Sequence, residues 1–398
     1  MKIDDLIRTY CPEGVKRVRL EEVCKITTGK LNANAMVDGG EYAFFTCSDT
    51  IYQIDNYAFD CEALLVAGNG YLGNVKYFKG KFNAYQRTYV LYDFIEGIEA
   101  MFLFYCMKAF FRDYAIAAQK DGSVPYITLG TLQSFEIPLP PLPVQEAIVG
   151  YLDKLTSLTA ELEAELEAEL ELQKKRYDFY RNRLLSFAPD SATQFDARLN
   201  STTPVKWMKL GEIAEIIRGG NFQKKDFVES GYPCIHYGQI YTHYGTSATE
   251  TITYVGEDVF CKSKKAQPND IVMAVTSENI EDVCKCVAWI GKEPIAVSGH
   301  TAIIHHQQNA KYLSYYFHTA MFAEQKKKLV HGTKVIEVTP KALEEILIPL
   351  PPLSEQERIV GILDKYETLV HNTQEGIPAL IAAVKQKYEY YRERMLTF

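Results

Sequence analysis

One stretch of this chain occurs twice. Residues 137–154 return as residues 348–365, with fourteen of eighteen positions identical and a shift of 211 residues. The same shift relates residues 176–187 to residues 387–398, so no residue is gained or lost between the two landmarks. A helical rod needs an exact length, whereas a loop does not. The chain is therefore predicted to be a two-fold internal repeat in which each copy is a globular unit followed by a rod.

The composition suits two folded domains. The 398 residues are 47% hydrophobic and 12% aromatic, which is enough to fill two cores. No apolar run approaches the ~20 residues of a membrane span, and the N-terminus lacks the apolar stretch of a signal peptide. Nine scattered cysteines indicate reduced thiols, so we expect a cytoplasmic protein. The net charge of −8 argues mildly against nucleic acid, although residues 205–348 hold 16 acids and 16 bases.

The two globular units open alike and then diverge. Residues 15–29 match residues 205–219 at a shift of 190, so the extra residues of the second copy follow this opening. Apolar segments broken by Gly and Asn predict strands over 42–46, 63–67, 75–78 and 88–92, and over 232–236, 270–275, 285–290 and 301–305. One helix of about 20 residues is predicted next in each copy (97–119 and 308–330, already at a shift of 211), followed by a short strand (124–128 and 335–339). Strands followed by a helix predict an α+β fold.

Heptad spacing predicts that both rods are long helices. Apolar residues step by three and four along 148–187 and 359–398, with one stutter at the same place in each. Antiparallel pairing needs no long return of the chain, so we expect two pseudo-two-fold-related globular domains joined by two long antiparallel coiled-coil helices. Pro378 is expected to kink or interrupt the second helix. The predicted helix-pairing or partner-docking positions are Ile148, Leu152, Leu155, Leu162, Leu166, Tyr177, Tyr180, Ile359, Leu363, Tyr366, Val370, Ile377, Ile381, Tyr388 and Tyr391.

These patterns divide the chain into six segments. They are an N-terminal segment (1–14), a first globular domain (15–137), a first helical spacer (138–187), a linker (188–204), a second globular domain (205–348) and a second helical spacer (349–398).

No catalytic constellation is visible. Residues 68–73 satisfy G-x-G-x-x-G, but strand and turn residues follow where a dinucleotide site needs a helix, so a loop between strands is the better interpretation. There is no phosphate-binding G-x-x-x-x-G-K-[ST] motif, no Pro-Pro-Tyr after Asn or Asp, and no histidine cluster with metal-ligand spacing. We therefore expect no cofactor, no metal and no enzymatic activity in this chain.

The divergent regions carry polar and aromatic side chains on glycine-rich loops. Asn, Gln and Arg can read base edges, and Lys can neutralise phosphate. For any single one a solvated loop residue is the better interpretation, and the DNA-binding hypothesis rests on the collection. The first-domain DNA-binding candidates are Lys30, Asn32, Asn34, Asn69, Tyr71, Asn74, Lys76, Lys79, Lys81, Asn83, Tyr85, Gln86 and Arg87. The second-domain candidates are Arg218, Asn221, Gln223, Lys224, Lys225, His236, Tyr237, Gln239, Tyr241, His243, Tyr244, Thr276, Ser277 and Asn279.

The repeated 137–154 and 348–365 entries, the paired helix ends and the two unlike globular domains together resemble the specificity subunit of type I restriction–modification systems. The resemblance covers essentially the whole chain. It implies that each globular domain is a target-recognition domain that reads one half of a bipartite DNA site. It also implies that the helices set the unread spacer and dock two modification methyltransferase subunits, which restriction subunits join. Methylation, ATP hydrolysis and cleavage would then belong to the partners.

Two other classes of function remain open from the residues alone. A non-catalytic coiled-coil scaffold whose globular domains bind protein or carbohydrate would need no basic surface. An enzyme in its own right is disfavoured by the missing motifs.

Overall fold

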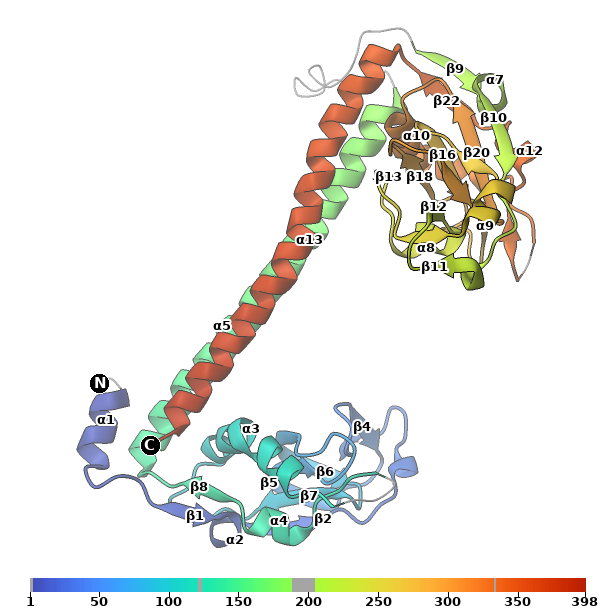
Figure 1. Cartoon of the computed structure of the whole chain (residues 1–398). Coiled ribbons are helices and arrows are strands. Elements are labelled where there is room, and N and C mark those ends of the chain that lie inside the picture. Colours follow the sequence, from blue (N-terminus) through green and yellow to red (C-terminus); the bar gives the residue numbers. More distant parts are fainter. Residues whose placement is uncertain (1–2, 121–123, 188–204, 333) are drawn as a thin grey trace. The chain divides into compact units, whose positions relative to one another are not determined.

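The computed structural model describes residues 3–120, 124–187, 205–332 and 334–398 (Figure 1). The predicted linker, residues 188–204, lies outside these ranges. The chain divides into two compact units. The first comprises residues 1–167 and 377–398, and the second comprises residues 168–376. Each unit therefore combines one globular domain with about half of each long helix.

The first unit is built on a six-stranded sheet in the order β2-β7-β5-β6-β3-β4. All its strand pairs are antiparallel except β3 with β6. A separate two-stranded antiparallel sheet pairs β1, near the start of the domain, with β8, at its end. The elements are α1 (Ile3–Tyr10), β1 (Arg17–Arg19), α2 (Leu20–Val23), β2 (Lys25–Thr28), η1 (Ala33–Ala35), β3 (Tyr42–Phe45), β4 (Ile51–Ile54), β5 (Phe59–Ala67), β6 (Val75–Ala84), β7 (Thr88–Tyr92), α3 (Ala100–Ala117), α4 (Leu129–Gln133) and β8 (Glu136–Pro138).

Alternation along β5 gives this sheet two apolar faces. Leu64 and Val66 face the main core, where Phe102 and Phe111 of α3 are fully buried. Leu65 faces the opposite side, where it joins an aromatic cluster that includes the edge-to-face pair of Phe45 and Phe82. Helix α3 thus lies on one face of the sheet (Figure 1), and the aromatic cluster lies on the other.

The second unit has two five-stranded sheets, ordered β10-β20-β16-β18-β13 and β11-β14-β12-β19-β15. The four strands that the sequence predicts over 232–236, 270–275, 285–290 and 301–305 are confirmed as β12, β16, β18 and β20. The elements are β9 (Lys206–Lys209), α7 (Leu210–Ile213), β10 (Ala214–Arg218), η2 (Lys224–Asp226), β11 (Phe227–Val228), β12 (Tyr232–Ile235), α8 (Tyr237–Thr242), β13 (Ser247–Ala248), β14 (Thr253–Val255), α9 (Glu257–Lys262), β15 (Lys265–Ala266), β16 (Asp270–Ala274), β17 (Thr276–Ser277), β18 (Cys286–Trp289), β19 (Ile295–Val297), β20 (Thr301–His306), α10 (Ala310–Phe317), α11 (Ala320–Lys326), β21 (Ile336–Glu337), α12 (Pro340–Leu343) and β22 (Leu347–Leu350).

The single helix predicted over 308–330 is wrong, because the structure has α10 and α11 instead. Thr319 separates them, and its Oγ1 accepts a hydrogen bond from the Phe322 amide at 3.2 Å. A threonine cap competes with continued helix at this point. The break also changes the relation between the copies: Asn309 takes the place of Glu99 at a shift of 210, whereas Phe322 takes that of Phe111 at 211.

The short strand predicted over 124–128 is reduced to isolated bridges at Tyr126, with Asn69 and with Lys120. In the second copy the corresponding segment forms β21, which pairs with β17. The longer loop of the second copy provides the partner strand.

The two long helices are α5 (Leu142–Ser186, 45 residues) and α13 (Leu353–Leu396, 44 residues). They run antiparallel in each unit. In the first unit, Thr156 of α5 contacts Tyr388 of α13 at 3.0 Å between their hydroxyls, and Glu163 pairs with Lys385 at 3.2 Å. In the second unit, the rings of Tyr180 and Tyr366 stack with centroids 5.0 Å apart. The predicted antiparallel pairing is confirmed.

The interruption expected at Pro378 is wrong, because α13 continues through it as one helix. A proline inside a helix costs about 3 kcal/mol, since it removes one donor and crowds the preceding turn. The neighbouring Ile377 is buried, and packing of this kind offsets that cost.

The predicted helix-pairing positions differ in how deeply they are buried. Six of them are buried: Ile148, Leu152, Ile359, Leu363, Val370 and, at the middle of α13, Ile377. Others are half-buried: Leu155, Leu166, Tyr177, Tyr180, Tyr366, Ile381 and Tyr388. Leu162 and Tyr391 are 38% and 37% exposed, so they lie at the margin of the helix pair.

A buried glutamine joins each globular domain to its helix. In the first unit, Gln145 of α5 accepts from the Glu99 amide at 2.9 Å and donates to the Gly97 and Pro140 carbonyls at 2.8 and 2.7 Å. In the second unit, Gln356 accepts from the Asn309 amide at 3.0 Å and donates to the Pro351 carbonyl at 2.9 Å. The repeated glutamine of the helix entries therefore has a structural role.

Candidate nucleic-acid interface

In the first unit, the turn at residues 85–87 draws several loops together. The Tyr85 amide donates to the Phe45 carbonyl at 2.8 Å, and the Gln86 amide donates to the Leu31 carbonyl at 2.9 Å. The Arg87 carbonyl accepts from the Gly68 amide at 3.0 Å. Three loops that are distant in sequence thus meet at one edge of the sheet, which we call the first loop edge.

Glycine is required at this crossing. A Cβ on Gly29 would lie 1.9 Å from the Ala84 carbonyl oxygen, and a Cβ on Gly68 would lie 2.6 Å from that of Arg87. Only residues without a side chain allow these backbones to approach so closely. The glycine-rich motif is therefore a crossing of strands and loops, as the sequence predicted.

Most of the first-domain candidates belong to the segments of this edge. They are Lys30, Asn32, Asn34, Asn69, Tyr71, Asn74, Lys76, Tyr85, Gln86 and Arg87. Two of them are already bonded: Asn74 donates to the Asp49 carboxylate, and the Lys76 ammonium donates to the Ser48 carbonyl. Burial lowers the pKa of Lys76.

Three candidates lie on the second half of β6 and have partners within the domain. Lys79 forms an ion pair with Glu62 at 3.9 Å, and the Lys81 ammonium lies 4.8 Å from the centre of the Tyr57 ring. Asn83 is 5% exposed, and its amide donates to Asn56 at 2.8 Å. Asn83 therefore has a structural role.

The second unit has a corresponding edge around the turn at residues 298–300. The Ser298 amide donates to the Ile235 carbonyl at 3.0 Å, and the His300 carbonyl accepts from the Val275 amide at 2.9 Å. The Gly219 amide donates to the Thr301 carbonyl at 3.0 Å, as the Gly29 amide donates to Thr88 at 3.2 Å in the first unit. We call this crossing the second loop edge.

This second edge gathers a different set of candidates. The Tyr237 ring lies between His236 and His300, with centroids 4.5 and 5.2 Å away. Arg218 pairs with Glu337 at 3.0 Å, and the Tyr241 hydroxyl donates to the Thr276 carbonyl at 2.6 Å. The candidates on its segments are Arg218, Asn221, His236, Tyr237, Tyr241, Thr276 and Ser277.

His300 was missed by the sequence analysis. It has φ +61, and its carbonyl makes the bond that Arg87 makes in the first unit. Aligning Thr301 with Thr88, the first residues of β20 and β7, would have revealed it. Burial, followed by the charges of Lys224 and His300, lowers the pKa of the nearby His236.

The remaining second-domain candidates lie elsewhere or support the backbone. The Gln239 amide donates to Thr253 Oγ1 at 3.0 Å, and Asn279 closes a turn by donating to Asp282 at 2.8 Å. Lys224 and Lys225 lie on η2, which Gln223 precedes.

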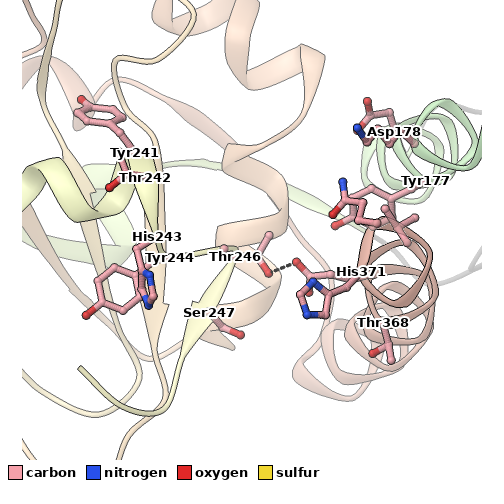
Figure 2. A pocket seen from close by; sticks show the side chains of 15 residues that line it. Tyr177, Asp178, Tyr241, Thr242, His243, Tyr244, Thr246, Ser247, Thr368 and His371 are labelled. Atoms are coloured by element: carbon pink, nitrogen blue, oxygen red, sulfur yellow. Dashed lines mark hydrogen bonds between the residues drawn. The ribbon is translucent and has the colours of Figure 1, made fainter. Parts of the chain in front are cut away.

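His243 and Tyr244 line a groove of about 730 Å³ between residues 241–247 and the paired helices of the second unit. Figure 2 shows Tyr177 and His371 on the helical side of this groove and His243 and Tyr244 on the other. Thr246 bridges the two sides through a 2.6 Å hydrogen bond from its Oγ1 to Glu367 (Figure 2). These two candidates thus face the helices instead of the second loop edge.

The described residues offer little for other chemistry. Among them, no group of three or more His, Cys, Asp or Glu side chains is placed to hold a metal ion. In the same part of the chain, no helix is both long and apolar enough to cross a membrane.

The long helices also expose apolar side chains at repeat-related positions. Leu158 and Leu369, which a shift of 211 relates, are each 51% exposed. Phe179 and Tyr390, related by the same shift, are 62% and 56% exposed. Of these four repeat-related side chains, each unit therefore exposes one leucine and one aromatic ring on its helix pair.

A family model described as the type I restriction modification DNA specificity domain matches residues 12–172 and 204–383. The chain belongs to the type I restriction–modification specificity subunit family. It is 26% identical to the type I restriction enzyme EcoDI specificity subunit of Escherichia coli, over 94% of this chain and 86% of that protein. It is 28% identical to a putative specificity subunit of Haemophilus influenzae, over 95% of this chain and 94% of that one.

Solved structures share the fold of this specificity subunit. One, from work on complex assembly and conformational transition of the type I restriction–modification system, matches with a TM-score of 0.70 at 19% identity, over 97% of this chain and 98% of that one. The specificity subunit of Thermoanaerobacter tengcongensis matches with a TM-score of 0.58 at 18% identity, over 97% of each chain. The predicted family and fold class are confirmed.

Proposed function

We propose that this specificity subunit reads a bipartite DNA target, one half with each loop edge. The observation that carries the proposal is that the same crossing of loops occurs in both units and presents different side chains. The first edge offers Lys30, Gln86 and Arg87, whereas the second offers Arg218, Asn221 and His300. Side chains of these types read base edges and hold phosphates, so two unlike edges suit two unlike half-sites.

Each segment of the chain has a place in this function. Residues 15–137 and 205–348 are the two target-recognition domains, and residues 138–187 and 349–398 are the spacers that set the unread gap. The candidates at the two loop edges are the proposed DNA contacts. Lys79, Lys81, Asn83, Gln239, His243, Tyr244 and Asn279 are not proposed as direct contacts. The chain works in the cytoplasm, where its DNA lies.

The specificity subunit is non-catalytic, and partners carry the chemistry in this proposal. Two methyltransferase subunits dock on the helix pairs, and restriction subunits with ATP-dependent endonuclease activity join them. The exposed pairs Leu158 with Tyr390 and Leu369 with Phe179 support two copies of one partner, because the repeat presents the same apolar pair twice. The alternative of a scaffold that binds protein or carbohydrate finds no support in the family comparison.

A gel-shift measurement tests the proposal. The chain is reconstituted with the modification methyltransferase of its host and mixed with duplexes that contain the two-part motif methylated in that host. A specific shift that is lost when either half is scrambled supports the proposal. Equal binding to all duplexes, or no binding, contradicts it.

A further inference from the structure

One loop of the second recognition domain is four residues longer than its counterpart, and landmarks on both sides fix the comparison. Gly68 and Val275 each accept from an equivalent amide, that of Ile127 at 2.9 Å and that of Val338 at 3.0 Å. Beyond the loop, Gly73 and Cys284 both adopt left-handed backbone, with φ +73 and +67. Leu72 and Val283 directly precede them. Residues 69–71 of the first copy therefore correspond to residues 276–282 of the second.

The longer loop has an anchor that the shorter one lacks. Lys326, in the last turn of α11, is only 6% exposed. Its ammonium donates to the carbonyls of Glu281 and Val283, each at 2.7 Å. The first copy has Ala115 at this position, fully buried, and a Cβ on Gly73 would lie 3.4 Å from the Ala115 Cβ. The short loop of the first copy packs directly on α3, whereas the Lys326 side chain separates the long loop of the second copy from α11.

The cost of burying this ammonium shows that the contact is specific. A buried charge is unfavourable unless hydrogen bonds replace its water, and the two backbone carbonyls do so here. Burial lowers the pKa of Lys326, which agrees with this environment. Both acceptors belong to the backbone, so the lysine fixes the path of the chain and leaves the side chains of the loop free to differ.

The loop that Lys326 holds ends at the second loop edge. It begins with β17, which pairs with β21 beside Arg218, and the Thr276 carbonyl accepts from Tyr241. Its tip, residues 278–281, is exposed. Asn279 and Asp282 close the tip into a turn through 2.7 and 2.8 Å hydrogen bonds. The loop is thus an exposed, internally hydrogen-bonded projection, held at its start by β17 and at its end by Lys326.

We propose that Lys326 is a positioning residue for DNA specificity: it holds residues 276–282 at the second loop edge, and this loop helps to select the half-site that residues 205–348 read. The inference rests on the proposed function and adds a determinant that does not itself touch DNA. Lys326 acts through the loop backbone.

The experiment compares Lys326→Met with Lys327→Met in the full complex. Lys327 is the exposed neighbour, paired with Glu324 at 2.6 Å, so it controls for the loss of one positive charge. Each variant is produced in cells with its partner subunits, and the methylated motif is read by sequencing modified bases. Lys326→Met is expected to keep the first half of the motif and to relax the second half by about tenfold at one or more positions, since one base pair contributes that much discrimination. Lys327→Met should keep both halves, and Lys326→Arg should restore most of the selectivity.

An unchanged second half in Lys326→Met overturns the inference, as does equal relaxation in Lys327→Met. If the wild-type chain gives no two-part motif, the proposed function fails first, and the two failures are distinguishable.

A second variant covers the case in which Lys326→Met does not fold. Residues 276–282 are replaced by the Asn-Gly-Tyr of the first copy, together with Lys326→Ala, which restores the short-loop packing seen at Ala115. This variant should melt well above Lys326→Ala alone and should lose selectivity only in the second half. A melting temperature no higher than that of Lys326→Ala, or an unchanged motif, contradicts the inference.

Discussion

The Tyr315 hydroxyl lies 2.7 Å from Asp364 Oδ1, and the same arrangement joins Tyr105 to Asp153 at 2.7 Å in the other copy. Each tyrosine comes from the helix that covers a recognition domain, and each aspartate comes from a long helix. The contact at Tyr315 includes more groups than the one at Tyr105. Glu367 lies 2.8 Å from the same Tyr315 hydroxyl, and Lys311 pairs with Asp364 at 2.5 Å. These contacts fasten each globular domain to its spacer.

Tyr315→Phe should therefore destabilise the second unit by about 1–3 kcal/mol, since two neighbouring carboxylates lose a buried donor. Tyr105→Phe removes a donor from one carboxylate and should cost less. Urea unfolding of the purified chain measures both. Equal and negligible effects would show that these hydroxyls do not fasten the domains.

Substitution of the buried glutamines should lower the free energy of unfolding more than the two tyrosine substitutions do. Gln145→Leu leaves the Glu99 amide and two carbonyls without their partner, so we expect a loss of about 2–4 kcal/mol in the free energy of unfolding. Gln356→Leu should cause a similar loss in the second unit. Gln145→Glu keeps the acceptor but removes the donor, so it separates the two roles. A leucine variant as stable as the wild type would contradict this account.

His306 should make the second unit sensitive to acid. Its ring is 8% exposed, its Nε2 has no partner among the described residues, and burial lowers its pKa to about 4. The unfolded chain takes up this proton near pH 6.5, whereas the folded chain resists it until about pH 4. The contribution of neutral His306 to the free energy of unfolding is therefore fully present above pH 6.5. It falls by up to about 3 kcal/mol as the pH approaches 4.

His306→Asn, which keeps an acceptor for the Gln308 amide, should reduce this slope in unfolding curves measured between pH 7 and 4. The slope should not vanish, because burial also lowers the pKa of His318. An unchanged slope in the variant would show that His306 is not responsible.

The repeated apolar pairs predict a stoichiometry. Leu158→Glu should remove one methyltransferase subunit from the complex, Leu369→Glu should remove the other, and the double variant should bind neither. Both leucines are half exposed, so the free energy of unfolding should change by less than about 0.5 kcal/mol. Ala160→Glu, on the opposite side of the same helix, is the control. Native mass spectrometry counts the subunits, and two retained copies in the double variant would exclude this surface.

The sequence predicted the repeat, the helices and the main strands because these depend on local periodicity and on equal lengths. It failed where one contact overrides a pattern. Pro378 remains inside its helix because packing offsets the lost hydrogen bond, and Thr319 ends a helix that the apolar pattern would continue. At Thr319 the deciding contact spans only three residues, yet the apolar period carries no trace of it.

The candidate DNA contacts could be predicted only in part, because residue type does not show where a side chain lies in the fold. Residue type alone brought forward Arg87, which lies at an edge, and also Asn83, which is buried. His300 was missed because its role comes from a carbonyl that bonds Val275, and backbone bonds leave no signature in residue type. Lys326 is one of three consecutive lysines, and only Lys326 is buried among them, which residue type does not reveal.

Exchange of residues 205–348 for the corresponding domain of another specificity subunit tests the central claim most directly. The methylated motif is determined by sequencing modified bases in cells that produce the exchanged chain with its partners. We predict a two-part motif in which one half and the gap are unchanged and the other half is new. A change in both halves, or a motif without a gap, would contradict the assignment of one half-site to each loop edge.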